Sequence, residues 1–381
     1  MATSKRLWKP VRDQAADSFW MLLITALSIT VMVTRVYLEL TGYPQVGDST
    51  YHVAHVLWGG LLLFIAVALP LSIVNRYALW TSAVLGGIGA GLFIDEVGKF
   101  ITQSNDYFFP LAFPIIYGFI LVCVWLYWRI RRHQPRDTRT LLYHALEDLK
   151  QVLDNDLDPF EHRELMTELK LVTEQATDPN ELRLAKELLD FVQSRELRLA
   201  TKPNFAERLI EDLRHVFANR PARWTLKTIL LIGWGLMSIN ALAKLWALIV
   251  VAANEGALHS ALGEFVVVSG KSQYMVNNEL LLLTTQVLII VTGVMALAAV
   301  ILLLLKRDDL GVRIGTVALI FSLCVVNFLT FYFVQIYALL EAAGQVFLLV
   351  VAALYRWRFL DVTTRTEVKP KAKTGAASAG D

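Results

Sequence analysis

The stretch GGIGAGLFIDEVGKF, residues 86–100, closes a glycine-rich apolar segment with three charged residues. The apolar segment that contains it, residues 78–101, is long enough to cross a bilayer, because about 20 apolar residues in a helix span the hydrocarbon core. Charged side chains in such a segment are costly unless they face a bundle interior or a wet cavity. Asp95, Glu96 and Lys99 therefore indicate a polar site at the end of a membrane helix.

Seven further apolar runs accompany this segment. Hydrophobic residues make up 55% of the 381-residue chain and charged residues 18%, a composition that a soluble domain could not cover with polar surface. The runs form two blocks of four, at residues 18–40, 53–74, 78–101, 109–130, 226–252, 280–305, 312–334 and 336–353. We therefore predict an all-α polytopic membrane protein with eight transmembrane helices.

Lysine and arginine are concentrated in alternate connections of this arrangement. They cluster before the first run, after the fourth and after the eighth, and such basic segments remain in the cytoplasm. We predict a location in the bacterial inner membrane, with the lipid bilayer as partner and both termini in the cytoplasm. The formal net charge is only +2, so no nucleic-acid partner is expected.

The charged segment between the two blocks is expected to fold as a separate helical domain in the cytoplasm. Asp158 and Asp178 each begin an Asp-Pro-x-Glu sequence, which is typical of a helix start because Asp caps the first amides and Pro lacks an unused donor. We predict four helices at about 138–153, 159–176, 179–197 and 204–218. This domain suits a cytoplasmic protein partner. The predicted division is a membrane block (1–130), a cytoplasmic domain (131–223), a second membrane block (224–361) and a disordered tail (362–381).

Small residues predict close packing of the second and third apolar helices. The pattern consists of His52, His55, Gly59 and Gly60 on the second helix and of Gly87, Gly91 and Asp95 on the third. Residues three or four apart share a helix face, and small residues at that spacing let two backbones approach closely in lipid. If the two faces pack together, the imidazoles meet the carboxylate near the outer membrane surface.

Other polar residues are expected at a similar depth. They are Arg35, Asp48, Glu96, Lys99, Asn105, Asp106, Lys244 and Glu341. Their number predicts a polar cavity that opens to the outside of the cell. The alternative is structural, because Asp95 and Lys99 stand four apart and could neutralise each other at the headgroup level.

Four of these residues suit a divalent metal such as zinc. Imidazole and carboxylate groups are usual ligands of such ions, and the candidates are His52, His55, Asp95 and Glu96. A metal-free site is the alternative, with an imidazole as proton carrier.

The same region resembles a known group of proteins. The run Asp48-x-x-x-His52, the pair Gly59-Gly60, the glycines of 86–91 followed by Asp95-Glu96, and Asn105-Asp106 together resemble the VanZ-like and YjdF-like small bacterial membrane proteins. The motif GLFIDEVGKF also resembles a signature of uncharacterised bacterial multi-span proteins. The resemblance covers about residues 48–109; it implies a role in the cell envelope and brings no established reaction.

Three functions are compatible with these features. The first is an envelope protein whose outward-facing His/Asp/Glu site acts on a polar or lipid-linked group. The second is a proton- or ion-coupled transporter in which Asp95, Glu96, Lys244 and Glu341 line a path. The third is a scaffold or sensor that acts through residues 131–223. Whether the protein is an enzyme stays open.

Overall fold

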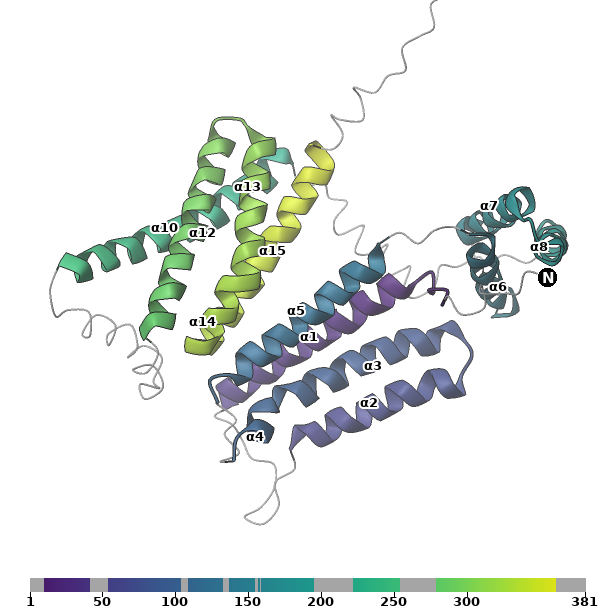
Figure 1. Cartoon of the computed structure of the whole chain (residues 1–381), viewed down its shortest axis with the longest axis horizontal. Helices are drawn as coiled ribbons and strands as arrows, with labels where there is room; N and C mark the ends of the chain where they lie inside the picture. Colours follow the sequence, from purple (N-terminus) through teal and green to yellow (C-terminus); the bar gives the residue numbers. More distant parts are fainter. Residues whose placement is uncertain are drawn as a thin grey trace, which may run out of the picture. The chain divides into compact units, whose positions relative to one another are not determined.

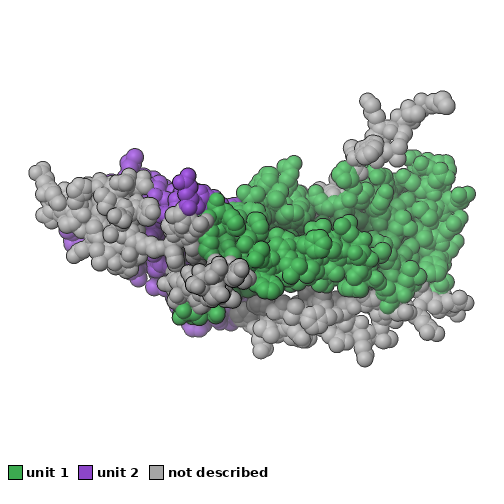
Figure 2. Space-filling view, turned by 90° about the horizontal axis from the view of Figure 1, so that it is seen from below, with its two compact units in different colours: residues 1–100, 119–219 green, residues 101–118, 220–381 purple. Residues whose placement is uncertain are grey.

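The computed structural model describes residues 10–41, 54–103, 109–132, 137–154, 157, 159–194, 222–253 and 279–360. All regular elements in these ranges are helices, and eight of them are long and apolar enough to cross a membrane. The prediction of an all-α polytopic membrane protein with eight spans is therefore confirmed. The chain forms two compact units, unit 1 with residues 1–100 and 119–219 and unit 2 with residues 101–118 and 220–381 (Figure 2).

Unit 1 contains the first apolar helices. They are α1 (Ala16–Thr41), α2 (His55–Ser72), α3 (Arg76–Asp95), the short α4 (Val97–Ile101) and the later part of α5 (Ala112–Arg131). Helix α3 lies between α1 and α2 and packs against both (Figure 1). Because α3 is covered on two sides, it needs two faces of small residues.

The first small face of α3 meets α2 through one pair of glycines. A Cβ added to Gly59 would lie 2.9 Å from the carbonyl oxygen of Gly89, and a Cβ added to Gly89 would lie 2.8 Å from that of Gly59. Only glycine allows this approach. Gly60 has nothing within 4 Å of its Cβ position, so its predicted packing role is wrong. It lies about 100° round the helix from Gly59 and is therefore off the contact face.

The second small face of α3 meets α1. A Cβ on Gly87 would overlap the carbonyl oxygen of Leu23, and one on Gly91 would lie 3.0 Å from that of Leu27. The prediction that Gly87 and Gly91 pack against α2 is therefore wrong. Their spacing of four does define one face, but spacing alone does not decide which neighbouring helix covers it.

The third predicted span is interrupted at Glu96. Helix α3 ends at Asp95, Glu96 has φ −87° and ψ 8°, and α4 starts at Val97. The carbonyl oxygen of Asp95 accepts a hydrogen bond from Arg35 Nη2 at 2.8 Å, whereas the amide of Lys99 donates to the carbonyl oxygen of Glu96 at 3.0 Å. The expected single helix over 78–101 is thus two helices, because a side chain takes a carbonyl that a continuous helix would use.

A three-helix bundle completes unit 1. It consists of α6 (Thr138–Asp154), α7 (Pro159–Gln175) and α8 (Pro179–Val192), around buried residues such as Leu141, Leu165 and Leu169. Asp178 accepts a hydrogen bond from the amide of Asn180 at 2.8 Å, as its capping role predicts. Helix α8 ends five residues before the predicted boundary. The predicted helix at 204–218 and the tail at 362–381 lie outside the described residues.

Unit 2 holds the remaining apolar helices. They are α10 (Arg223–Ala253), α12 (Glu279–Leu304), α13 (Asp308–Phe321), the π-helical turn η1 (Ser322–Val326), α14 (Asn327–Phe333) and α15 (Gln335–Phe359). Helix α10 packs against α12 and α15, and α12 packs against α13 (Figure 1). Trp234 is fully buried in their core, and a Cβ on Gly315 would overlap its indole ring. Gly315 therefore makes room for this large side chain.

Candidate functional site

Five of the predicted polar residues come together in unit 1. They are Arg35 on α1, His55 on α2, Asp95 and Glu96 at the end of α3, and Lys99 on α4. We call these five residues the charge cluster. Arg35, Asp95 and Glu96 are at most 2% exposed. Buried charges of this kind are tolerated when they are paired and hydrogen-bonded.

Arg35 binds Asp95 through two of its nitrogens. Its Nε is paired with the Asp95 carboxylate, and its Nη2 donates to the Asp95 carbonyl oxygen at 2.8 Å. The sequence explains why Arg35 faces α3. Leu27, Val31 and Arg35 are spaced by four, and all three are buried. They form one stripe of α1, which faces the side of α3 that carries Asp95.

His55 lies between the two carboxylates. Its Nδ1 is 3.0 Å from Glu96 Oε1, and its Nε2 is 3.2 Å from Asp95 Oδ2. Lys99 Nζ is 3.3 Å from the same Glu96 oxygen. Only the doubly protonated imidazolium presents an N–H on both ring nitrogens. The charge cluster thus joins α1, α2, α3 and α4 with two carboxylates and three basic groups.

Four further residues were predicted for this site. Asp48, His52, Asn105 and Asp106 lie outside the described residues. Within the ranges that are described, no group of three or more His, Cys, Asp or Glu side chains is arranged to hold a metal ion.

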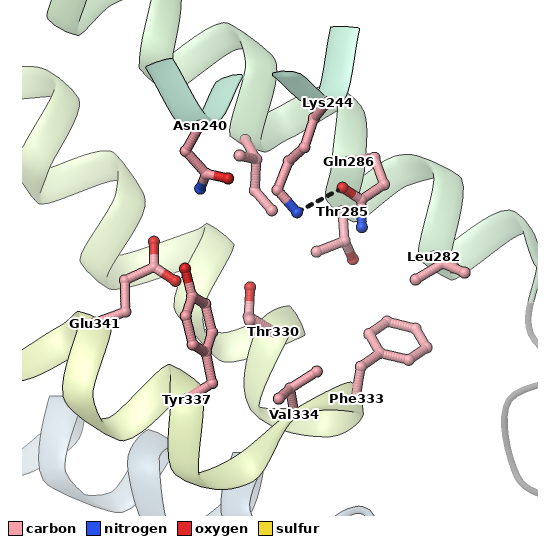
Figure 3. Close-up of a pocket in the computed structure, with 11 residues that line it drawn as sticks. Asn240, Lys244, Leu282, Thr285, Gln286, Thr330, Phe333, Val334, Tyr337 and Glu341 are labelled. Atoms are coloured by element: carbon pink, nitrogen blue, oxygen red, sulfur yellow. Dashed lines mark hydrogen bonds between the residues drawn. The ribbon is translucent and has the colours of Figure 1, made fainter. Parts of the chain in front are cut away.

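A separate polar site lies inside unit 2. It is a cavity of about 90 Å³ enclosed by α10, α12, α14 and α15 (Figure 3). Its polar lining consists of Asn240, Lys244, Thr285, Gln286, Thr330, Tyr337 and Glu341. We call it the polar cavity. Lys244 projects into it from α10, and Glu341 does so from α15 on the facing side.

Neutral amides hold both charged groups of the polar cavity. Lys244 Nζ donates to Gln286 Oε1 at 2.9 Å. Gln345 Nε2 donates to Glu341 Oε1 at 3.1 Å, and Gln345 Oε1 accepts from Asn327 Nδ2 at 3.1 Å. Asn327 is fully buried and Gln345 is 3% exposed. Asn327 thus holds Gln345 in place, and Gln345 in turn holds the Glu341 carboxylate.

A second cavity of about 160 Å³ continues the first along the helices. It shares Asn240, Tyr337 and Glu341 with the polar cavity and extends to Thr292 and to Ser322 of the π-helical turn. The polar lining is therefore not confined to one end of the apolar helices. Turns of π-helix inside α-helices are frequent at functional sites.

The sequence reasoning named Lys244 and Glu341 but missed the residues that hold them. A signal for Gln345 was present, because Glu341 and Gln345 stand four apart and so share a helix face. Gln286 carried no such signal, since its partner lies on another helix. The prediction placed these residues in one cavity with the charge cluster, whereas the structure shows two polar sites, each within its own unit.

The resemblance to the VanZ-like and YjdF-like proteins stays a prediction. No family model, no curated protein and no solved structure matches the chain.

Proposed function

We propose that the protein is a membrane transport protein that binds a small polar solute in the polar cavity. One observation carries this proposal: an amine and a carboxylate, Lys244 and Glu341, face an internal cavity from two predominantly apolar helices (Figure 3). Solute binding in a polar site between membrane helices is a feature of many transporters.

The cost of the two charges supports a functional role. A charged residue in a membrane helix costs energy, up to about 3 kcal/mol at the helix centre on insertion scales, and leucine at either position would avoid that cost. The polar cavity retains both charges and surrounds them with the side chains of Asn240, Thr285 and Tyr337. Such a lining offers hydrogen-bond donors and acceptors to a solute that leaves water.

Water access to the polar cavity gives the first test. In a chain with Cys123 and Cys324 replaced by Ala, Asn240→Cys should react with a charged, water-soluble methanethiosulfonate. Leu242→Cys is the matched control on the same helix, because Leu242 is 49% exposed on the outer surface of the helices, where lipid would cover it. Equal, low reactivity of both thiols would contradict a solute-accessible cavity.

A solute screen gives the second test. Amino acids, carboxylates, amines and sugars are screened for those that raise the melting temperature of the purified protein, and each active solute is then tested for flux in proteoliposomes. Lys244→Met and Glu341→Gln should abolish both effects. Thr285→Val should weaken them, because Thr285 lines the cavity, whereas Thr284→Val on the exposed face of α12 should not. Stabilisation and flux that survive in all cavity variants would refute the proposal.

The charge cluster supports a second candidate function. His55 lies 3.2 Å from Asp95 Oδ2 and 3.0 Å from Glu96 Oε1, and imidazole and carboxylate groups are the ligand types that would bind a divalent metal in an envelope protein acting on a polar or lipid-linked group. Binding would need His55 to lose its proton and Lys99 to leave Glu96, because cations beside the site repel a metal. About one zinc per chain, lost in His55→Ala, is the expected result; purified protein without stoichiometric metal contradicts this candidate.

We also propose that the membrane is the bacterial inner membrane and that both termini face the cytoplasm. The distribution of lysine and arginine between connections supports this orientation. It puts α6–α8 in the cytoplasm, where a protein partner could reach them, and the charge cluster near the outer surface.

A further inference from the structure

One end of unit 2 carries a dense group of basic side chains. Three segments meet there: the start of α10, the α12–α13 connection and the end of α15. Residues 223–227, 306–313 and 355–359 contain seven lysines and arginines and two aspartates. We call this region the basic end; its cations exceed its carboxylates by a wide margin.

A buried carboxylate organises the basic end. Asp308 is 7% exposed, and its Oδ1 accepts from Lys227 Nζ at 2.8 Å while its Oδ2 accepts from Arg223 Nη2 at 2.8 Å and from the Tyr355 hydroxyl at 2.5 Å. The other aspartate, Asp309, is paired with Arg313 at 3.0 Å. One carboxylate thus draws two cations and a phenol from two other helices to one point.

Aromatic rings hold the guanidinium groups in place. Arg223 Nε donates to the Tyr355 hydroxyl at 3.2 Å. The guanidinium carbons of Arg223 and Arg358 lie 5.9 and 5.3 Å from the centre of the Phe359 ring. A guanidinium has five N–H donors, and the bonds of Arg223 to Tyr355 and Asp308 use only two. Donors remain for an external oxyanion.

The connection between α12 and α13 has a lysine at a position where glycine is the usual residue. Lys306 has φ 60°, and the bonds from the Lys306 amide to the Leu303 carbonyl and from the Arg307 amide to the Leu302 carbonyl close the end of α12. Glycine is favoured at this left-handed position. A lysine there places a cation at the basic end at a cost in backbone energy.

Two exposed tryptophans indicate the depth of the basic end. Trp224 is 75% exposed and Trp357 is 70% exposed, and each is next in sequence to an arginine of the group. Tryptophan is enriched at the headgroup level of membranes. An oxyanion that bound these cations would therefore lie at the depth of the lipid phosphates.

We propose that the basic end is a binding site for the phosphate headgroup of an anionic phospholipid, held by Arg223, Lys227, Lys306, Arg307 and Arg358. Basic pockets between membrane helices bind such headgroups through charge-assisted hydrogen bonds. Asp308 and Tyr355 act as positioning residues, because they orient Arg223 and Lys227 without contacting the lipid.

The test uses the full-length protein in detergent, titrated with phosphatidylglycerol or phosphatidylcholine and followed by native mass spectrometry. Wild type should bind phosphatidylglycerol in preference to phosphatidylcholine. The double variant Arg307→Gln, Arg358→Gln should lower phosphatidylglycerol affinity about 30-fold, because each of the two lost cations usually contributes about 1 kcal/mol to binding. The variant Arg183→Gln, Lys186→Gln on α8 removes the same charge from exposed positions and should bind as wild type does.

Two further measurements distinguish a lipid site from a free-phosphate site and from diffuse charge attraction. Inorganic phosphate added in excess should not displace phosphatidylglycerol; displacement would show a free-phosphate site and overturn the lipid assignment. Asp308→Asn raises the positive charge but releases Arg223 and Lys227, so an organised site should bind more weakly. Tighter phosphatidylglycerol binding by Asp308→Asn would show diffuse charge attraction and overturn the proposal. A loss of affinity in the α8 control as large as that in the Arg307→Gln, Arg358→Gln variant would do the same. Phosphatidylcholine binding reports whether each variant is still folded.

Discussion

His55 Nδ1 lies 3.0 Å from Glu96 Oε1. This contact joins the first turn of α2 to the residue that separates α3 from α4, and Lys99 approaches the same oxygen at 3.3 Å. The break between α3 and α4 is therefore where several charged groups meet. We expect the charge cluster to fix the relative positions of α1, α2 and α3.

The pair formed by Arg35 and Asp95 should be a strong stabilising contact that depends on both partners. Arg35→Gln or Asp95→Asn leaves one buried charge without its main partner, which typically costs 3–5 kcal/mol. The double variant removes both charges and should lose less than the sum of the single changes. Unfolding in mixed micelles with rising SDS measures each loss. Strictly additive losses would contradict a coupled pair.

Substitution by alanine should destabilise the protein at Gly87 of α3 but not at Gly60 of α2. Gly87→Ala forces the α1–α3 backbones apart and should cost about 1–3 kcal/mol, as overpacking usually does. Gly60→Ala meets no atom within 4 Å and should be neutral or stabilise by up to about 1 kcal/mol through helix propensity. The same SDS titration gives both values. A Gly60→Ala loss as large as that of Gly87→Ala would refute the packing described for α3.

Much of the fold was predictable because bilayer length and hydrophobicity act locally along the chain. The eight spans and the Asp178 cap follow from composition and from side chains that bond within a few residues. The neighbour of the Gly87 face did not follow, since a small face fits either adjacent helix. The break at Glu96 also escaped prediction, because it depends on Arg35, which lies 60 residues before its partner Asp95.

The candidate sites were predictable in part for the same reason. Charges in apolar runs identify Asp95, Lys244 and Glu341 as residues that need partners. The sequence does not identify the partners when these are neutral amides on other helices, such as Gln286. It also grouped the two polar sites together, whereas the helices of unit 1 form one and the helices of unit 2 form the other.

Lys306→Gly should stabilise the protein. Lys306 has φ 60°, a conformation that costs a side-chain-bearing residue about 1 kcal/mol relative to glycine. Arg307→Gly is the control, because Arg307 has φ −91° and gains nothing from the substitution. Thermal unfolding in detergent compares the two variants with wild type. A lower melting temperature for Lys306→Gly would show that its side chain contributes more than the backbone strain costs.

The orientation in the membrane can be tested with single thiols. In a background without Cys123 and Cys324, Thr41→Cys at the end of α1 should react with an impermeant maleimide in intact spheroplasts. Glu174→Cys on α7 should react only after the membrane is opened, because the basic connections place that bundle inside. Both positions are exposed. The opposite labelling pattern would reverse the proposed topology.

Asp148 should make the α6–α8 bundle less stable as pH rises. It is 5% exposed, and its Oδ1 lies 3.6 Å from Nη1 of Arg76, the first residue of α3. Burial raises the pKa of Asp148 to about 7; Arg76 opposes this rise, and Glu168 and Glu161 add to it. An unfolded aspartate loses its proton near pH 4. Between about pH 4 and pH 7 the folded bundle therefore holds a proton that the unfolded chain has released.

The free energy of unfolding should consequently fall by up to about 1.4 kcal/mol per pH unit in that window and level off above it. Hydrogen exchange of the α6 and α7 amides in the full-length protein, corrected for the intrinsic effect of pH, measures this slope. Asp148→Asn should reduce the slope, whereas Asp190→Asn, an exposed position on α8, should leave it unchanged. Because Arg76 begins α3, the Asn variant should also alter protection at the start of that helix. Equal slopes in all three proteins would show that Asp148 is ionised in the folded bundle.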